Sequence, residues 1–223
     1  RRLRAETQGE VQFDTASRGR YATDASIYQI MPVGVFVPAT PQDVAAALAV
    51  ARELKVPVLP RGGGTSQCGQ TTAAALVIDC SKHLRRVLDV NVQARTATVE
   101  PGLVLDHLNA ALKKHGLWFP VDVSTSAQAT LGGMAGNNSC GSRSLHYGNM
   151  VHNVAGAQAW LADGAVVDFG PARAATGRAA QIAVFVRGLA DQHRSEIEAH
   201  WPRLLRRVAG YNLDIFHPRS EKP

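Results

Sequence analysis

The sequence predicts an α+β fold, and three observations support this class. Two apolar runs, residues 33–37 and 56–59, have the composition of buried strands and enclose a strongly signalled helix, which is a βαβ arrangement. Residues 87–90 and 96–100 then alternate like the two partners of a hairpin. Helical spacing becomes dominant after a change in composition near residue 170, so helices and strands are only partly intermixed.

Composition places the chain among folded globular proteins. It has 223 residues, 45% apolar and 19% charged, and no apolar run approaches the ~20 residues that span a bilayer. The start, Arg-Arg-Leu-Arg-Ala-Glu, lacks the apolar core of a secretory signal. Cys68, Cys80 and Cys140 are widely spaced without a C-x-x-C pair, which argues against a disulfide framework or a structural zinc site. We therefore expect a cytoplasmic protein with no bound metal.

The net charge of +6 raises nucleic-acid binding as an alternative. The basic residues are scattered along the chain, and few aromatic residues lie between them to stack on bases. A solvated basic surface is the favoured interpretation, and we expect no nucleic-acid partner.

The first part of the chain combines an irregular start with a clear helix signal. Residues 1–32 are polar with isolated apolar side chains and are predicted to form an irregular leader. A helix is predicted to start at Thr40-Pro41-Gln42-Asp43, because Thr40 can cap it, Pro41 fits its first turn and Asp43 favours its positive end. Its apolar face follows at the helical spacing and consists of Val44, Ala47, Leu48 and Ala51.

Further elements follow from local patterns. A short buried strand is predicted at residues 76–79, and a helix at residues 103–115 that Gly116 ends. The Asp163-Gly164 pair predicts a tight turn between strands. Beyond residue 170, helix is expected around Ile197 and over residues 204–208. The leucines that the helix at 103–115 should turn inward are Leu105, Leu108 and Leu112, and the apolar face of a later helix comprises Ile182, Phe185, Val186, Leu189 and Ala190.

A glycine-rich stretch follows the second strand directly. The chain runs from residue 60 into Pro-Arg-Gly-Gly-Gly-Thr-Ser-Gln. Glycines can take φ > 0 and let a ligand approach the backbone, so successive N–H groups can line an anion-binding nest. The carboxyl end of a parallel strand is also where open α/β sheets bind ligands. This stretch therefore predicts a pyrophosphate site, with a plain turn between strands as the alternative.

Two better-known phosphate loops are excluded. No lysine follows the glycines, so the stretch is not G-x-x-x-x-G-K-[ST]. Gln67 stands where the last glycine of G-x-G-x-x-G would be.

A second dense stretch spans residues 120–141. It is rich in small polar residues, carries the pair Gly132-Gly133 and is long for a loop inside a compact domain, which is typical of functional loops. Thr130 is predicted to cap a short helix within it.

The two stretches together resemble the FAD-linked oxidases and dehydrogenases. The shared order is P-R-G-G-G-T-S, then P-x-D-x-S-T, then A-T-L-G-G-M and an N-x-S-x-G tail. This flavin-binding fold is typified by vanillyl-alcohol oxidase and p-cresol methylhydroxylase. T-D-A-S at residues 23–26 and G-Y-N-L-D at 210–214 look like its D-lactate and D-2-hydroxyglutarate dehydrogenase branch, which includes large bacterial members with an iron–sulfur region. The resemblance covers roughly residues 20 to 216.

The resemblance implies a fold and a cofactor site. FAD is expected between two small α/β subdomains of the p-cresol methylhydroxylase-type FAD-binding fold, at residues 33–100 and 101–170, with residues 171–223 as a helical extension. Carried over, the cofactor-binding residues are Arg61, Gly62, Gly63, Gly64, Thr65, Ser66 and Gln67 around the pyrophosphate, Asp122, Ser124, Thr125 and Thr130 along the ribityl chain and the adenosine, Leu131, Gly132, Gly133 and Met134 close to the flavin, and Asn137, Asn138, Ser139 and Cys140 against the ring or the phosphates.

Two departures from the family qualify these expectations. Relatives that bind flavin covalently carry a histidine in the first stretch, where this chain has Gly64 and Thr65, so non-covalent FAD is expected. Family members continue past G-Y-N-L-D into a substrate domain that carries the catalytic base. We therefore expect an N-terminal fragment without that domain, inactive alone, with its catalytic residues unknown.

The predicted function is the FAD-binding domain of an oxidoreductase that transfers a hydride from a D-2-hydroxy acid to FAD. The alternatives are a non-catalytic flavin-binding module and a basic nucleic-acid-binding domain. The resemblance implies a small 2-hydroxy acid as substrate and leaves the electron acceptor open. Self-association is expected from surface that a substrate domain would cover, and a membrane-peripheral location is the alternative for a longer enzyme.

Overall fold

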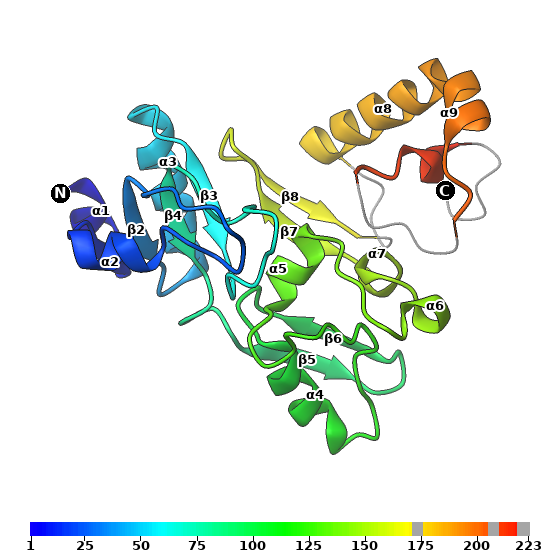
Figure 1. Ribbon diagram of the computed structural model, residues 1–223, viewed down its shortest axis with the longest axis horizontal. Helices are drawn as coiled ribbons and strands as arrows, with labels where there is room; N and C mark the ends of the chain where they lie inside the picture. Colours follow the sequence, from blue (N-terminus) through cyan, green and yellow to red (C-terminus); the bar gives the residue numbers. More distant parts are fainter. Residues whose placement is uncertain (171–175, 205–209, 218–223) are drawn as a thin grey trace.

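The computed structural model describes residues 1–170, 176–204 and 210–217. A sheet lies at the N-terminal end and helices at the C-terminal end (Figure 1). The helix expected over residues 204–208 falls almost wholly outside the described residues. The elements in chain order are α1 (Arg2–Glu6), β1 (Glu10–Gln12), α2 (Thr15–Arg20), β2 (Gly34–Val37), α3 (Pro41–Glu53), β3 (Val58–Arg61), β4 (Leu76–Asp79), β5 (Val87–Asn91), β6 (Thr96–Val99), α4 (Leu105–Lys113), α5 (Leu131–Gly136), α6 (Ser144–Tyr147), α7 (Met150–Asn153), β7 (Ala157–Trp160), β8 (Val166–Phe169), α8 (Gly177–Gln192), α9 (Arg194–His200) and the 3-10 helix η1 (Leu213–Phe216).

The first sheet contains the predicted βαβ unit with one rearrangement. Its strand order is β1-β2-β4-β3, with β2, β4 and β3 parallel and β1 antiparallel to β2. The two strands of the unit, β2 and β3, are therefore not neighbours, because β4 lies between them. Parallel strands end at the same edge of a sheet, so Val37, Arg61 and Asp79 bring the chain to one edge.

Helix α3 begins where the sequence predicts. Thr40 Oγ1 accepts a hydrogen bond from the Asp43 N–H at 3.2 Å, and the Asp43 carboxylate accepts one from the Thr40 N–H at 3.1 Å, which completes a capping box. Two residues of the predicted apolar face, Ala47 and Ala51, are buried against the sheet. The predicted start and orientation of this helix are confirmed.

Two large hydrophobic cores and a smaller cluster of Val35, Val37 and Val77 form within the described residues. The first lies between the sheet and helices α1 and α3 and includes Phe36 and Ile78. The second surrounds α4 and includes Leu105 and Leu108. Apolar side chains of β5 and β6 pack against the second core. The hairpin therefore packs with the later part of the chain, although the sequence placed it in the first subdomain, because its one apolar face meets α4.

The leader is more ordered than expected. Residues 1–32 form α1, β1 and α2, with Glu10 of β1 opposite Val37 and Leu3 of α1 buried in the first core. The sequence missed this because elements of three to six residues are too short to show a periodic pattern. Between residues 21 and 29 the chain is irregular, apart from an isolated bridge that pairs Thr23 with Gln29.

The second unit follows the predicted pattern closely. β5 and β6 pair antiparallel, as expected. Helix α4 buries Leu105, Leu108 and Leu112, and the chain leaves it through Gly116, whose φ of 67° lies in the left-handed region. The hairpin and the inward leucines are therefore confirmed.

The last described part starts with the predicted hairpin and continues as helix. β7 and β8 pair antiparallel around Gly164, which has φ 87°. The turn is tied to the end of α3, because Arg52 Nη1 donates to the Asp163 carbonyl at 2.6 Å. In α8, Ala190 is buried but Phe185 is 68% exposed, although the sequence placed both on the inward face. The main described neighbours of α8 are η1, β8 and α9, and they leave the Phe185 side chain largely uncovered.

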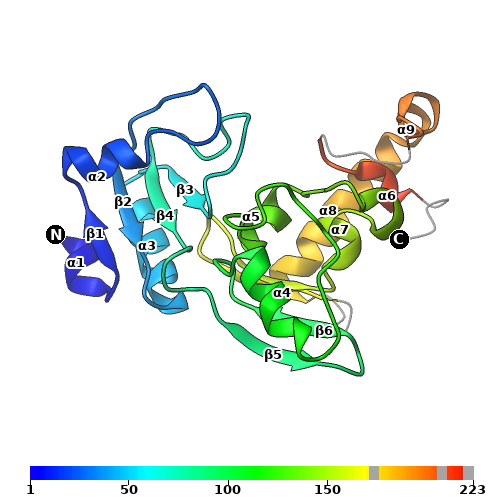
Figure 2. The same ribbon diagram turned by 60° about the horizontal axis from the view of Figure 1, so that its bottom comes forward.

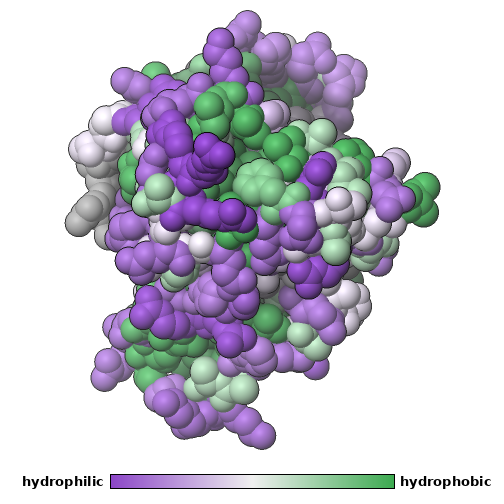
Figure 3. Space-filling model, turned by 90° about the vertical axis from the view of Figure 1, so that its left-hand side faces the viewer, coloured by the Kyte–Doolittle hydropathy of each residue, from purple (hydrophilic) through white to green (hydrophobic). Residues whose placement is uncertain are grey.

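The surface at the N-terminal end is mainly polar. Hydrophilic side chains cover most of this face, and apolar ones gather in smaller groups between them (Figure 3). Among the described residues, no helix is both long enough and apolar enough to cross a membrane. The same part of the chain contains no group of three or more His, Cys, Asp and Glu side chains that would hold a metal ion.

Candidate functional site

The first glycine-rich stretch leaves the sheet at the edge where the parallel strands end. β3 ends at Arg61, and residues 62–70 follow without helix or strand. Within the described residues, the backbone N–H groups from Gly62 to Gln67 donate no hydrogen bond, whereas the N–H of Cys68 donates to Gln70 Oε1 at 3.2 Å. Six successive unpaired donors after a strand fit an anion-binding nest. We call residues 62–67 the nest.

The three glycines are required for different physical reasons. Only Gly64 lies in the left-handed region, with φ 65°. A Cβ on Gly62 would overlap Thr130 Oγ1, and a Cβ on Gly63 would overlap the carbonyl oxygen of Gln128. The sequence explained all three by backbone freedom and ligand approach. In the structure, two of them allow the nest to contact the second stretch.

The structure thus brings the two predicted stretches together. Besides the contacts at Gly62 and Gly63, Gln70 Nε2 donates to Asn137 Oδ1 at 3.2 Å. Helix α5, which Thr130 precedes, lies between β3 and α4 (Figure 2). The nest therefore faces a boundary between the two hydrophobic cores, which is where the sequence expects the cofactor.

A cavity of about 390 Å³ opens beside the nest, within the size range of ligand sites. In it the Tyr21 hydroxyl donates to Asp79 Oδ2 at 2.6 Å. Burial and this hydrogen bond raise the pKa of Tyr21, so its hydroxyl stays protonated at neutral pH. The lining residues are Glu10, Gln12, Arg20, Tyr21, Val37, Arg61, Gly62, Gly63, Asp79, Ser81 and Lys82.

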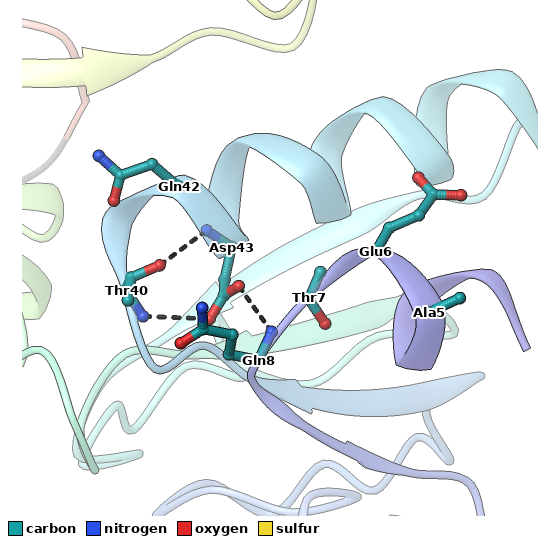
Figure 4. A pocket seen from close by; sticks show the side chains of 7 residues that line it. All are labelled: Ala5, Glu6, Thr7, Gln8, Thr40, Gln42 and Asp43. Carbon is teal, nitrogen blue, oxygen red and sulfur yellow. Dashed lines mark hydrogen bonds between the residues drawn. The ribbon is translucent and has the colours of Figure 1, made fainter.

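A second hollow lies away from the nest, between the end of α1 and the start of α3 (Figure 4). Its one buried carboxylate, Asp43, accepts hydrogen bonds from the backbone N–H groups of Gln8, Ala39 and Thr40. Because these bonds occupy the carboxylate in the capping of α3, this hollow offers no candidate chemistry.

The guanidinium of Arg61 is hydrogen-bonded to the chain's own backbone. It donates to the backbone carbonyls of Tyr21 at 3.3 Å, Thr71 at 2.9 Å and Thr23 at 2.8 Å. The guanidinium carbon also lies 5.2 Å from the centroid of the Tyr21 ring. A contact between Arg61 and pyrophosphate stays a prediction. In the structure, the side chain donates its hydrogen bonds within the protein.

Asp122 is likewise engaged within the chain. Its Oδ2 accepts from the Ser142 hydroxyl at 2.7 Å, and its Oδ1 accepts from the Arg143 N–H at 3.1 Å. A Cβ on Gly141 would overlap Asp122, so the chain passes closely over this carboxylate. Asp122 therefore holds the end of the second stretch in place, and its predicted contact with the cofactor is untested.

The start of α5 is built as predicted, but its side chains point inward. Thr130 Oγ1 accepts from the Gly133 N–H at 3.4 Å, which confirms the predicted cap. Leu131 and Met134 are buried in the second core. The N–H groups of Leu131 and Gly132 donate to the carbonyls of Leu103 and Pro101. A ligand could therefore lie against the backbone of this segment. In contrast to the nest, the segment has few unpaired N–H donors.

Among the described residues, some of the remaining predicted ones are hydrogen-bonded within the chain, and others have side chains without such a bond. Asn138 and Ser139 join α5 to α7, because Asn138 Oδ1 accepts from the Val151 N–H at 3.1 Å and the Ser139 carbonyl accepts from the Met150 N–H at 3.0 Å. Cys140 is half-buried with a free thiol. Within the described part of the chain, no hydrogen bond involves the hydroxyls of Thr65, Ser66, Ser124 and Thr125, which leaves them for a ligand.

An aromatic cluster beside the second stretch was not predicted. The Trp118 and Tyr147 rings meet edge to face at 5.2 Å, and the guanidinium carbon of Arg143 lies 5.1 Å from the Trp118 centroid. The His146 ring also packs edge to face on Tyr147, with the ring centroids 4.5 Å apart, and His146 is exposed. No local pattern announces this cluster, because Trp118 lies far from the others in the sequence.

The residues present fit a dinucleotide. Its pyrophosphate requires several fixed donors, which the nest supplies, and hydrogen bonds to a charged group contribute roughly 1.5–3 kcal/mol each. The free hydroxyls of Thr65 and Ser66 add donors to the same segment. The nest and residues 128–130 are in direct contact, which places the two stretches side by side. Among the described residues, this contact involves no ion pair.

Replacing Asp122 with asparagine is expected to weaken the fold in a pH-dependent way. Burial opposes ionisation, but hydrogen bonds from Ser142 and Arg143 hold the pKa of Asp122 below its ordinary value of 3.8. A lowered pKa stabilises the folded state above the unfolded pKa, and this stabilisation disappears as pH falls through the folded pKa. At about pH 6 the melting midpoint should therefore fall by roughly 2–4 °C, for a loss of about 1 kcal/mol from a partly exposed group.

Thermal unfolding of the wild type and Asp122→Asn at about pH 6 and about pH 2 measures this effect, since the stabilisation by the carboxylate is lost progressively as pH falls. Ser142→Ala is the matched control that removes one of the two bonds, and it should give part of the loss. An equal difference between wild type and variant at both pH values would contradict the assignment.

Comparison with known proteins agrees with this geometry. Residues 32–170 match the family model described as FAD binding domain. The D-2-hydroxyglutarate dehydrogenase of Pseudomonas putida is 36% identical over 96% of this chain, and that of Escherichia coli 34% identical over 92%. The glycolate oxidase subunit GlcD of Bacillus subtilis is 35% identical over 74% of the chain. The chain spans 22%, 21% and 36% of these three relatives, respectively.

Solved structures share the fold at lower identity. The wild-type BBE-like 1 protein of Physcomitrella patens superposes with a TM-score of 0.67 at 22% identity, and covers 77% of this chain and 37% of its own. An alkyldihydroxyacetonephosphate synthase gives a TM-score of 0.64 at 21% identity, over 70% of this chain and 31% of its own. The nest, its contact with the second stretch and the family match over residues 32–170 lead to one conclusion: the chain belongs to the FAD-binding domain family.

Proposed function

We propose that this chain is the flavin-binding part of an FAD-dependent oxidoreductase that oxidises a D-2-hydroxy acid of the D-lactate or D-2-hydroxyglutarate type. The observation that carries the proposal is the nest, whose six N–H groups are unpaired within the described residues and whose first two glycines lie against the second stretch. Support for the substrate class comes from relatives named D-2-hydroxyglutarate dehydrogenase, which are similar over more than nine-tenths of the chain.

In this proposal the chain's own residues bind and orient the cofactor. The N–H groups of residues 62–67 and the hydroxyls of Thr65 and Ser66 hold the pyrophosphate. The backbone of Gly132 and Gly133 and the polar side chains of the second stretch border the rest of the dinucleotide. When bound, FAD supplies the acceptor for the hydride removed from C2 of the acid. No residue of this chain is assigned as the catalytic base.

Titration of the purified chain with FAD tests the proposal. Flavin fluorescence should be quenched with a one-to-one end point, because bound flavin is removed from water. Riboflavin, which lacks both phosphates and the adenosine, is the ligand control. It should bind at least about a hundredfold more weakly, because each charged hydrogen bond that it forgoes contributes roughly 1.5–3 kcal/mol. Absence of FAD binding, or equal affinity for riboflavin, would contradict the proposed site.

Bound FAD is expected to be non-covalent. Gly64 and Thr65 occupy the region of the histidine that covalently linked relatives use. Burial and the nearby Asp79 raise the pKa of the Cys80 thiol to about 11, so this cysteine offers no thiolate at neutral pH. After acid precipitation of the loaded chain, all yellow colour should be in the supernatant. Colour that stays with the pellet would show a covalent bond.

The partners of this function are a small 2-hydroxy acid and an electron acceptor that is not identified. Self-association is also part of the proposal. Val184 and Phe185 of α8 are 71% and 68% exposed, and exposed apolar side chains of this kind favour contacts with another surface.

A further inference from the structure

We propose that Arg61 is a positioning residue that fastens a strap to the glycine-rich loop and so holds the nest ready for an anion. The strap is residues 21–28, and the loop is residues 61–71. The inference rests on the proposed function, because it concerns how the nest binds FAD. It differs from the expectation drawn from the sequence, in which Arg61 itself contacts the pyrophosphate.

The guanidinium of Arg61 joins three separate points of the backbone. Two lie on the strap, the carbonyls of Tyr21 and Thr23, and the third is the carbonyl of Thr71 at the far end of the loop. These bonds use three of the five N–H donors of the side chain. The planar fork thus closes the loop on itself and binds it to the strap at the same time.

The guanidinium also lies directly beside the turn of the nest. A Cβ on Gly64 would come within 2.6 Å of Arg61 Nη2, so the backbone of Gly64 rests against this group. Gly64 is the glycine whose φ of 65° reverses the chain direction. Movement of Arg61 would therefore release the residue that sets the shape of the nest.

Two further contacts close the strap over the loop. Asp24 Oδ2 accepts from the Thr71 hydroxyl at 3.0 Å and from its N–H at 3.4 Å. Although burial opposes ionisation, hydrogen bonds from Ser26 and Thr71 lower the pKa of Asp24, so the acceptor is a carboxylate at neutral pH. Farther along, a Cβ on Gly69 would come within 2.6 Å of the Tyr28 ring, so the ring covers the loop there.

This arrangement explains how a loop without secondary structure can hold unpaired donors in a fixed conformation. Within the described residues, the nest gains no order from backbone hydrogen bonds of its own. Each residue that must be ordered on binding costs about 1–2 kcal/mol in backbone entropy. The strap removes part of that cost before FAD arrives. Lysine cannot replace Arg61 in this role, because a single ammonium on a flexible stem lacks the planar fork that reaches three carbonyls.

The test compares Arg61→Lys and Arg61→Ala with the wild type in FAD titrations at low and high salt. Both variants should raise the Kd for FAD about tenfold or more, the equivalent of freeing one loop residue or more. The factor should be the same at both salt concentrations, because the lost bonds go to backbone carbonyls and not to the phosphates. The matched control is Arg52→Lys, since Arg52 also donates to a backbone carbonyl, that of Asp163, outside the strap and the loop. It should leave the Kd within about twofold.

Amide hydrogen exchange without FAD supplies a readout that is independent of the cofactor. In Arg61→Lys, the hydrogen-bonded amides of the loop, those of Cys68 and Thr71, should exchange faster, while β2 and β4 keep the rates of the wild type. Thr71→Val, which removes one contact to Asp24, should show the same pattern more weakly. A loss of protection throughout the first sheet would mean that Arg61 serves global stability and would overturn the proposal.

The outcomes separate this inference from the proposed function. Wild-type affinity in Arg61→Lys, or a deficit in Arg61→Ala that vanishes at high salt, would show that Arg61 acts as a counter-ion for phosphate and would overturn the strap. If the wild type itself binds no FAD, the proposed function fails. The exchange experiment then decides the strap alone, and unchanged exchange of the Cys68 and Thr71 amides would refute it.

Discussion

Gly63→Val is expected to abolish FAD binding. Even a Cβ at this position would overlap the Gln128 carbonyl oxygen, and valine adds two methyl groups to it. The nest must then move away from the second stretch, and its N–H groups are displaced with it. Loss of two hydrogen bonds to the pyrophosphate, at roughly 1.5–3 kcal/mol each, raises the Kd at least about a hundredfold.

The physical reason differs from the one that the sequence suggests. From the glycines alone, the valine would fill the phosphate space and oppose a positive φ, with a smaller effect on folding. Gly63 has no positive φ, and the overlap is with the backbone of another segment. We therefore expect the melting midpoint to fall as well, because the contact between the two stretches is strained.

Fluorescence titration with FAD and thermal unfolding measure the two effects. Gly19→Val is the matched control, because a Cβ at Gly19 meets nothing within 4 Å and its φ is not positive. It should bind FAD like the wild type. Unchanged affinity in Gly63→Val would show that the first stretch is only a turn.

The FAD-loaded chain is expected to remain oxidised when it is mixed with D-lactate or D-2-hydroxyglutarate without oxygen. Hydride transfer requires the substrate carbon against the flavin and a base within hydrogen-bond reach of the hydroxyl. Among the described residues beside the nest, Tyr21 donates to Asp79, Lys82 donates to Glu10, and the guanidinium of Arg61 is bound to carbonyls. None of these pairs supplies a base together with a clamp for the substrate carboxylate.

Anaerobic stopped-flow absorbance measures this directly. Dithionite should bleach the bound flavin fully and serves as the control that it can be reduced. The acids should bleach it at less than about 1 s⁻¹, the low end of enzymatic turnover. Faster bleaching by either acid would place the catalytic base within residues 1–223 and would contradict our division of the site.

Elements with a local signal could be predicted from the sequence. The capping box at Thr40 and Asp43 and the leucines of α4 stand at the predicted positions, because their interactions join residues three or four apart. The hairpin turn at Asp163-Gly164 is equally local. The two glycine-rich stretches were also visible as candidate ligand loops, because their composition departs from that of ordinary connections.

Features that depend on distant partners could not be predicted in this way. The position of β4 between β2 and β3, the strand β1 in the leader and the exposure of Phe185 each depend on which elements pack together. Asp122 was expected at the cofactor, but its carboxylate holds Ser142 and Arg143, about twenty residues away in the sequence.

The site shows the same division most clearly. The sequence by itself determined that Gly62, Gly63 and Gly64 form a loop with accessible N–H groups, because glycine permits such a backbone whatever surrounds it. Only the tertiary structure decided why two of them must be glycine and what Arg61 binds. The overlaps at Gly62 and Gly63 involve residues more than sixty positions away, and the Arg61 donors reach Tyr21 and Thr23 about forty positions before. No local energy distinguishes these partners, since they become neighbours only when the two cores and the leader are assembled.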